Sequence, residues 1–149
     1  TAFRRCIHFV ECLLIAPEAD ATGPTLVRYD MFFLRQKPKA GICAEEAVEG
    51  IKTGDVTVID VRDRMELKHS GMAQGAIHIP LMRLRDMADP RHPDFNPALK
   101  TDSKIAVYCA TGARSHSARA MLRKLGYEDV HNIGGLSHWV RAGGKVKRV

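Results

Sequence analysis

Apolar and polar positions from residue 41 onward alternate between helical and strand-like spacing. Four apolar residues have the i, i+3, i+4, i+7 spacing of one helical face: Ala44, Ala47, Val48 and Ile51. Glutamates fill the positions between them, and Gly54 ends the pattern, so the spacing predicts an amphipathic helix over 44–51. Residues 56–59 then form a short β-branched run, which predicts a buried strand.

The same alternation continues to the end of the chain. Apolar runs predict three further strands, over 76–79, 105–108 and 130–133. Helical signals separate the strands: a capping box from Asp63 to Glu66, apolar spacing over 81–87 and 118–125, and a short segment that carries Trp139. Gly126 is typical of the residue after a helix, and three prolines make 89–97 a loop.

Strands separated by helices predict an α/β fold, a single parallel-sheet domain with helices on both faces. Ligands of such sheets bind beyond the carboxyl ends of the strands. Two places therefore become candidates for a functional site: the residues that follow Ile59 and those that follow Tyr108.

Residues 1–40 have a different pattern, and we expect them to form an N-terminal extension of the domain at 41–149. Apolar runs at 7–15 and 26–34 flank a turn-rich stretch, which suggests a hairpin or a segment packed on the domain. Residues 37–41 resemble a linker. The apolar stretch near 7–16 is interrupted by His8 and Glu11 and is far shorter than the ~20 residues of a membrane helix. The same two residues fit poorly in a secretory signal, so we expect no membrane association.

Composition adds limits on partners and compartment. The 149 residues are 45% hydrophobic and 27% charged, which excludes a disordered chain, a fibre and a coiled coil. The net charge of +6 is concentrated in residues 71–149 and can attract small anions. Basic runs with interleaved aromatic residues are missing, so we expect no nucleic-acid partner. Four cysteines without a Cys-x-x-Cys pair, and histidines without ligand spacing, predict a reduced, cytoplasmic protein without a metal or cofactor.

The most informative segment follows the strand predicted at 105–108. It reads Cys109, Ala110, Thr111, Gly112, Ala113, Arg114, Ser115 and leads into a helix. Small side chains let the backbone N–H groups of the loop point inward as an anion cradle, and the helix N-terminus adds positive potential. Both effects lower the pKa of a cysteine from ~8.5. Arg114 adds a cation, so we interpret Cys109 as a nucleophile in an anion-binding loop; a merely buried cysteine is the alternative.

At this point the chain resembles the rhodanese family of sulfurtransferases, over about residues 42–144. Four segments carry the resemblance in the family's order: Val58-Ile59-Asp60-Val61-Arg62 with Glu66, Gly75-Ala76-Ile77-His78-Ile79-Pro80, the loop from Cys109 to Arg114, and Gly134-Gly135 with Trp139. The resemblance implies a rhodanese-like α/β domain. It also implies transfer of sulfane sulfur from a donor, thiosulfate or a persulfide, to a thiophilic acceptor.

The resemblance implies a role for each loop residue. Cys109 would attack the donor and become a persulfide, and a thiol or cyanide, or a sulfur-accepting protein, would remove the outer sulfur. The amides of Ala110, Thr111, Gly112, Ala113 and Arg114 would cradle the donor anion, and Arg114 would supply charge. The family often has an arginine directly after the cysteine, so Ala110 predicts weaker use of the thiosulfate dianion.

Several residues and functions keep two interpretations. Asp60 and Arg62 either orient the cysteine loop or form an ordinary ion pair in a βα turn. Cys43 either caps a helix or acts as a resolving thiol for Cys109.

A cysteine phosphatase or arsenate reductase is the alternative enzyme, although its Cys-x5-Arg loop is one residue longer than the Cys-x4-Arg spacing found here. A non-catalytic interaction module is the third hypothesis, and its members typically lack the cysteine.

Overall fold

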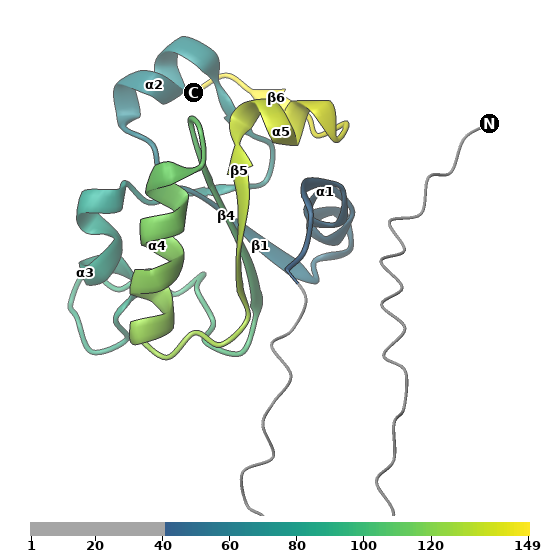
Figure 1. Ribbon diagram of the computed structural model, residues 1–149. Coiled ribbons are helices and arrows are strands. Elements are labelled where there is room, and N and C mark those ends of the chain that lie inside the picture. The colour runs from purple at the N-terminus through teal and green to yellow at the C-terminus, as the bar shows by residue number, and fades with distance from the viewer. Residues whose placement is uncertain (1–40) are drawn as a thin grey trace, which may run out of the picture. The chain divides into compact units, whose positions relative to one another are not determined.

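The computed structural model describes residues 41–149, and a four-stranded sheet forms their centre (Figure 1). Its strands are β1 (Val56–Asp60), β3 (Ile77–His78), β4 (Lys104–Cys109) and β5 (Val130–Gly135). They pair in the order β3-β1-β4-β5, and every pairing is parallel. The predicted α/β class with a parallel sheet is confirmed. The extension predicted over 1–40 lies outside the described residues.

Helices connect the strands at the positions that the helical signals in the sequence predicted. They are α1 (Ala44–Thr53), α2 (Arg64–Ser70), the 3-10 turn η1 (Leu81–Arg83), α3 (Leu84–Ala88), α4 (Ala113–Lys124) and α5 (Leu136–Arg141). A second, two-stranded sheet, which the sequence did not predict, pairs β2 (Met72–Ala73) antiparallel with β6 (Val146–Lys147). Within residues 41–149, no helix has both the length and the apolar character needed to cross a membrane.

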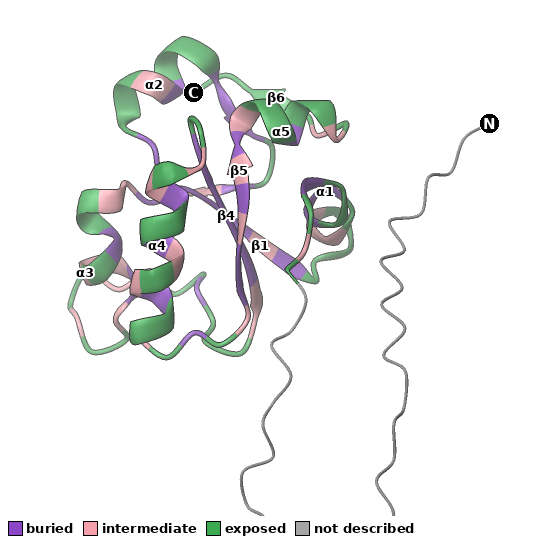
Figure 2. Ribbon diagram, viewed as in Figure 1, coloured by how far each residue is buried: buried purple, intermediate pink, exposed green. Residues whose placement is uncertain are grey.

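Side chains of the central strands alternate between two buried cores, one on each face of the sheet. Figure 2 shows these strands as mostly buried. Val58 and Tyr108 pack on one side with α1 and with Trp139 of α5. Ile59 and Val107 pack on the other side with α3 and α4. The expected coverage of both sheet faces by helices is therefore confirmed, and it leaves the carboxyl edge of the sheet as the place for a site.

Helix ends follow the predicted signals, with one informative difference. The Asp63 N–H donates a hydrogen bond of 3.0 Å to Glu66 Oε2, which confirms that pair as the start of α2. Gly126 has a φ of 97°, as expected for the residue that ends α4. Helix α4 begins at Ala113, inside the cysteine motif, so Arg114 and Ser115 belong to its first turn instead of the preceding loop.

Candidate active site

Cys109 is the last residue of β4 and lies at the carboxyl edge of the sheet, in the middle of its width. The neighbouring strand β1 ends at Asp60, which pairs with Tyr108. Both places selected from the sequence therefore meet at one edge, as expected for adjacent parallel strands. The Cys109 residue is fully buried, with an exposed fraction of 0%.

The turn after Cys109 aims backbone and side-chain donors at the sulfur. Gly112 precedes α4 with a φ of 114°, a conformation that favours glycine, and its N–H donates to Cys109 Sγ at 3.0 Å. The Ser115 hydroxyl lies 3.6 Å from the same sulfur, a distance at which the large sulfur atom still accepts a hydrogen bond. A thiolate in this position would face two donors and the N-terminus of a twelve-residue helix.

These donors decide the ionisation of the thiol. Burial alone raises the pKa of Cys109, because a charge is less stable away from water. The Ser115 hydroxyl and the backbone N–H groups of Ser115, Gly112 and Thr111 outweigh burial, and the net effect lowers the pKa below its ordinary value. The prediction from the sequence that the loop favours a thiolate therefore agrees with the geometry.

Ser115 and Asn132 are two site residues that the sequence analysis did not select. The Ser115 oxygen lies 2.8 Å from Asn132 Oδ1 as well as 3.6 Å from Cys109 Sγ, so its single proton is donated to one of these two acceptors at a time. The Asn132 side-chain amide donates to the Gly112 carbonyl at 3.1 Å. The Asn132 oxygen also accepts the Gly134 N–H at 2.8 Å. Asn132 of β5 thus fixes the serine and the turn behind the sulfur, and only the sheet pairing brings it there.

Gly135 allows the cysteine loop to lie directly against the end of β5. A Cβ atom at Gly135 would stand 2.1 Å from the Ala110 carbonyl oxygen, far inside van der Waals contact. A side chain at this position would therefore push the loop outward. This close approach explains why a glycine stands at the second position of the Gly134-Gly135 pair.

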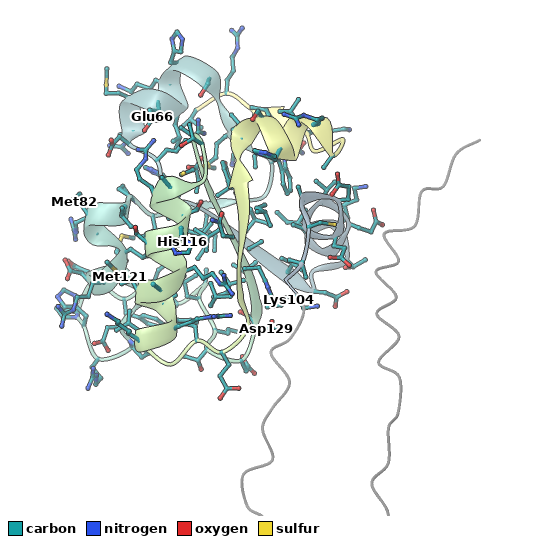
Figure 3. All side chains as sticks on the ribbon, viewed as in Figure 1. Glu66, Met82, Lys104, His116, Met121 and Asp129 are labelled. Carbon is teal, nitrogen blue, oxygen red and sulfur yellow. The ribbon has the colours of Figure 1, made fainter. Side chains whose placement is uncertain are left out.

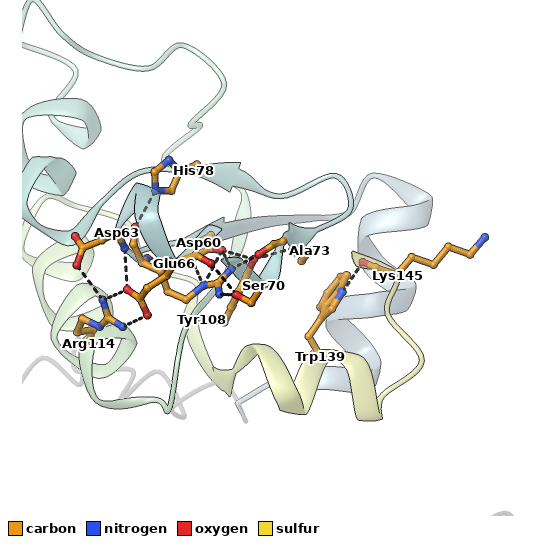
Figure 4. A network of polar contacts seen from close by, with 12 residues as sticks. Asp60, Asp63, Glu66, Ser70, Ala73, His78, Tyr108, Arg114, Trp139 and Lys145 are labelled. Carbon is orange, nitrogen blue, oxygen red and sulfur yellow. Dashed lines mark hydrogen bonds and ion pairs between the residues drawn. The ribbon is translucent and has the colours of Figure 1, made fainter. Parts of the chain in front are cut away.

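Arg114 points to α2 and forms a two-pronged ion pair with Glu66 (Figure 4). Its two terminal nitrogens donate to the Glu66 oxygens at 2.6 and 2.8 Å, and Asp63 lies within 3.6 Å. The hydrogen bonds from Arg114 lower the pKa of Glu66 to about 2. The cation expected at the end of the loop is thus largely neutralised by a carboxylate. A direct contribution of Arg114 to anion binding stays a prediction.

Asp60 and Arg62 form a buried pair beneath α2. The Arg62 side chain donates to the Asp60 oxygens at 2.7 to 3.1 Å, and both residues are at most 2% exposed. Although burial disfavours its charge, the hydrogen bonds to Asp60 raise the pKa of Arg62. Arg62 also donates to Ser70 Oγ and to the Gly71 carbonyl, at 2.8 and 2.6 Å, so the pair fastens the end of α2.

Tyr108 completes this buried network, which Figure 4 shows together with the Arg114 pair. Its hydroxyl donates to Asp60 Oδ2 at 2.5 Å and accepts the N–H of Ala73 at 2.9 Å. The network joins β1, β4, α2 and β2. Of the two interpretations of Asp60 and Arg62, these contacts favour an ion pair in a βα turn, with the added role of holding α2 beside the cysteine loop.

A cavity of ≈ 510 Å³ opens between α2, the cysteine loop and α5. We call it the mouth, and its lining residues are Arg62, Met65, Glu66, His69, Ser70, Ala110 and Leu136. It reaches the loop at Ala110, the residue next to the buried cysteine. The cavity therefore ends at the backbone beside Cys109, whose own buried side chain is not among the lining residues.

The other cysteine within residues 41–149 does not join this arrangement. Cys43 is exposed and stands immediately before α1, where its N–H donates to Glu46 Oε2 at 2.9 Å. Partial desolvation of its thiol, together with the nearby carboxylates of Glu45 and Glu46, raises the pKa of Cys43, so it is not activated as a nucleophile. Cys6 and Cys12 lie outside the described residues. Across residues 41–149, no three candidate metal-ligating side chains gather into a group.

Comparison with known proteins identifies the class of protein to which this fold and cysteine loop belong. Residues 44–142 match the family described as Rhodanese, the Rhodanese-like domain. The thiosulfate sulfurtransferase GlpE of Actinobacillus succinogenes is 33% identical over 103 residues, which cover 68% of this chain and 85% of that protein. The thiosulfate sulfurtransferase PspE of Escherichia coli is 38% identical over 80 residues, which cover 52% of this chain and 68% of that protein.

Solved structures agree with this assignment. The crystal structure of a rhodanese-related protein from Thermoplasma volcanium superposes with a TM-score of 0.57 at 36% identity, and covers 72% of this chain and 96% of that chain. The chain therefore belongs to the rhodanese family, and it is a rhodanese-type sulfurtransferase. The family resemblance drawn from the sequence is confirmed.

Proposed function

We propose that the protein moves sulfane sulfur from a small anionic donor to a thiophilic acceptor through a persulfide on Cys109. The observation that carries this proposal is a buried cysteine whose sulfur accepts the Gly112 N–H and the Ser115 hydroxyl. These donors favour a thiolate, which is the nucleophilic form of cysteine. They can equally stabilise the anionic outer sulfur of a persulfide.

Both half-reactions balance without another reactant. In the first, the Cys109 thiolate attacks the outer sulfur of thiosulfate, a sulfur–sulfur bond forms, and the old sulfur–sulfur bond breaks to release sulfite. In the second, cyanide or an acceptor thiolate attacks the outer sulfur of the persulfide and regenerates the Cys109 thiolate. Each transfer moves one neutral sulfur atom and leaves the total charge unchanged, so the reaction needs no resident metal or cofactor.

The comparisons and the mouth support the choice of partners. GlpE and PspE are named for thiosulfate, which makes a small sulfur oxyanion or a persulfide the first donor to test. The mouth of ≈ 510 Å³ leaves room for an acceptor larger than cyanide, and we include a thiol-bearing protein among the acceptors. We propose a reducing, cytoplasmic location, because an activated thiolate in an oxidising compartment would be consumed by disulfide exchange.

The direct test is the mass of the protein after incubation with thiosulfate. We expect the addition of one sulfur atom, located on the peptide that contains Cys109, and its removal by cyanide with release of thiocyanate. The Cys109→Ser variant should neither gain sulfur nor turn over. The matched control is Cys43→Ser, which removes the exposed thiol before α1 and should keep the full activity. Sulfur on Cys43 in the wild type, or turnover by Cys109→Ser, would contradict the proposal.

A phosphatase gains no support from the loop. Its spacing is Cys-x4-Arg, and both prongs of the Arg114 guanidinium are bound to Glu66. A phosphatase needs that guanidinium for the oxyanion of its substrate. Hydrolysis of p-nitrophenyl phosphate by the protein, abolished in Cys109→Ser, would favour the phosphatase over the sulfurtransferase.

A further inference from the structure

The charged groups that line the mouth are mostly neutralised by their own partners. Arg62 is paired with Asp60, and Glu66 is paired with Arg114. The residue beside the nucleophile is Ala110, which carries no charge. Apart from Arg62 and Glu66, His69 is the titratable residue of the lining. A dianion that enters the mouth therefore meets little uncompensated positive charge from its walls.

Apolar groups form the rest of the wall, on both sides of the cysteine loop. Met65 of α2 is 72% exposed, so its side chain lies outside both cores of the fold. Leu136, the first residue of α5, is half-buried and lines the opposite side. Ala110 lies between the two on the loop. Water-exposed apolar surface next to a nucleophile is surface that a bound substrate can cover.

We propose that the mouth selects monoanionic sulfur donors that carry an apolar body next to the transferred sulfur, and that Met65 and Leu136 contact this body. The proposal rests on the sulfurtransferase function proposed above and names its substrate class. An organic thiosulfonate or persulfide fits this description better than thiosulfate. Its single charge suits the cradle of N–H groups at Cys109, and its apolar group replaces water on Met65 and Leu136.

Thiosulfonates allow charge and apolar contact to be varied separately. The Cys109 thiolate attacks the terminal sulfur of the thiosulfonate, the sulfur–sulfur bond breaks, and a sulfinate leaves with the electron pair. The products are the Cys109 persulfide anion and one sulfinate anion, so atoms and charge balance. Methanethiosulfonate and benzenethiosulfonate share the charge and the leaving-group type, whereas thiosulfate carries one more negative charge and no apolar group.

The experiment compares kcat/KM for the three donors with cyanide as acceptor. We expect benzenethiosulfonate to exceed methanethiosulfonate by about tenfold in the wild type, because the phenyl group covers apolar surface. The two donors also differ in intrinsic reactivity, which is measured from their rate constants with a small-molecule thiolate. Dividing the enzymatic ratio of kcat/KM by the ratio of these rate constants gives the corrected ratio. Met65→Ala should reduce the corrected ratio by about threefold to tenfold, because benzenethiosulfonate loses more apolar contact than methanethiosulfonate. Met65→Leu should keep most of the ratio.

Met82 supplies the matched control. It is 87% exposed on η1, and Figure 3 shows it apart from the helix that carries Glu66. Met82→Ala should therefore leave kcat/KM unchanged for all three donors. Met65→Lys should reverse the preference between donors, because it adds a cation and removes apolar surface. It should raise kcat/KM for thiosulfate and lower kcat/KM for benzenethiosulfonate. The exposure of Met65 makes all three substitutions at that position compatible with folding.

The outcomes separate this inference from the function on which it rests. A corrected ratio near one in the wild type, or equal losses on both thiosulfonates in Met65→Ala, would overturn the selection by the mouth while sulfur transfer stands. A loss of the ratio in Met82→Ala would overturn it as well. Failure of all three donors to place sulfur on Cys109 would instead overturn the proposed function.

Discussion

Hydrogen-bond donors of individual residues, from backbone and side chain, lower the pKa of the cysteine more than full charges do. The sulfur of Cys109 is approached by the Gly112 N–H at 3.0 Å and the Ser115 hydroxyl at 3.6 Å. The cation of the cysteine motif, Arg114 in the first turn of α4, is held by Glu66. Dipoles in a buried position act strongly because the interior screens them little.

Ser115→Ala should raise the pKa of Cys109. The substitution removes the hydroxyl that lowers this pKa, whereas the burial that raises it remains. The measurement is the rate of alkylation by iodoacetamide against pH, whose midpoint should move to higher pH. Ser117→Ala, on the exposed side of the same helix, is the control and should leave the midpoint in place. An unchanged midpoint in Ser115→Ala would assign the activation to the backbone N–H groups alone.

Ala110→Arg should improve the use of thiosulfate by supplying a cation beside the nucleophile. We expect a higher kcat/KM, mainly through a lower KM, because an added charge binds the ground state and the transition state alike. The gain should shrink as salt is added, since screening acts over ~10 Å at 0.1 M ionic strength. The measurement is a salt series with thiosulfate and methanethiosulfonate. Equal gains for both donors would show that charge does not govern donor choice.

Elements are held around the site by contacts that join α2, α4 and β5. The pair between Arg114 and Glu66 connects the first turn of α4 to α2. Asn132 and Gly135 let β5 support the cysteine loop from behind. The geometry of the loop therefore depends on the placement of neighbouring elements as well as on its own sequence.

The Arg114–Glu66 pair should make part of the stability dependent on acid. Because Arg114 holds the pKa of Glu66 at about 2, against 4.5 for the free side chain, the pair stabilises the fold above pH 4.5. This contribution should disappear as the pH falls from 4.5 towards 2. Arg114→Ala should lose about 1 kcal/mol at neutral pH, because both side chains are partly exposed and screened by water, and should show a flatter profile in this range. Urea unfolding at several pH values measures both.

The two halves of the ion pair offer a control for this prediction. Glu66→Gln should flatten the acid profile in the same way as Arg114→Ala. It also releases the Arg114 cation, so kcat/KM for thiosulfate should rise in Glu66→Gln and fall in Arg114→Ala. Arg114→Lys should restore only part of the stability, since a point charge cannot reproduce the planar fork of the guanidinium. Identical acid profiles in the wild type and in Arg114→Ala would contradict the assignment.

Gly135→Ala should displace the cysteine loop while the sheet stays intact. The added Cβ would overlap the Ala110 carbonyl oxygen, and the loop can yield more easily than β5. A shift of about 1 Å in the position of a nucleophile can lower kcat/KM by about 100-fold. We expect a loss of 10- to 100-fold with a native circular dichroism spectrum. Gly41→Ala is the control, because its nearest neighbour is the His131 ring at 3.9 Å. Full activity in Gly135→Ala would contradict the tight contact.

At the scale of the described domain, the site forms where two central strands deliver their ends to one edge of the sheet. Helix α2 covers this edge and is fixed from below by Arg62 and Tyr108. The C-terminal end of the chain lies beside α2 (Figure 1). There β6 pairs with β2, directly after α2 in the sequence. The last residues of the chain thus help to hold the wall of the mouth.

Removal of residues 145–149 should destabilise the domain. Lys145 provides the carbonyl that accepts the N–H of the buried Trp139 at 3.0 Å and of Gln74 at 2.8 Å. Leaving these donors without a partner should cost about 1–3 kcal/mol for the buried indole. Urea unfolding measures this loss, and removal of residues 148–149 alone is the control that should change little. Equal stability of the two truncated proteins would contradict the role of β6.

The sequence by itself determined the fold class and the elements of the central sheet and its helices, and it selected the cysteine that we propose as the nucleophile. Spacing of apolar residues is a local property, because each helix face or strand face is encoded within about ten residues. The cysteine at the end of a strand, followed by small residues and a helix, is equally local. These patterns sufficed to select Cys109 as the candidate nucleophile, which stays a prediction. The family resemblance that they carry was confirmed by the family match over residues 44–142.

Only the tertiary structure decided which charges remain available and what supports the loop. Arg114 and Glu66 are separated by 48 residues, and Ser115 and Asn132 by 17, so neither contact leaves a mark in local spacing. The same holds for β2 and β6, each of two residues, too short to have a period. Electrostatics and close packing depend on distances between elements. Whether the loop arginine is a free cation was therefore decided when the chain folded α2 against α4.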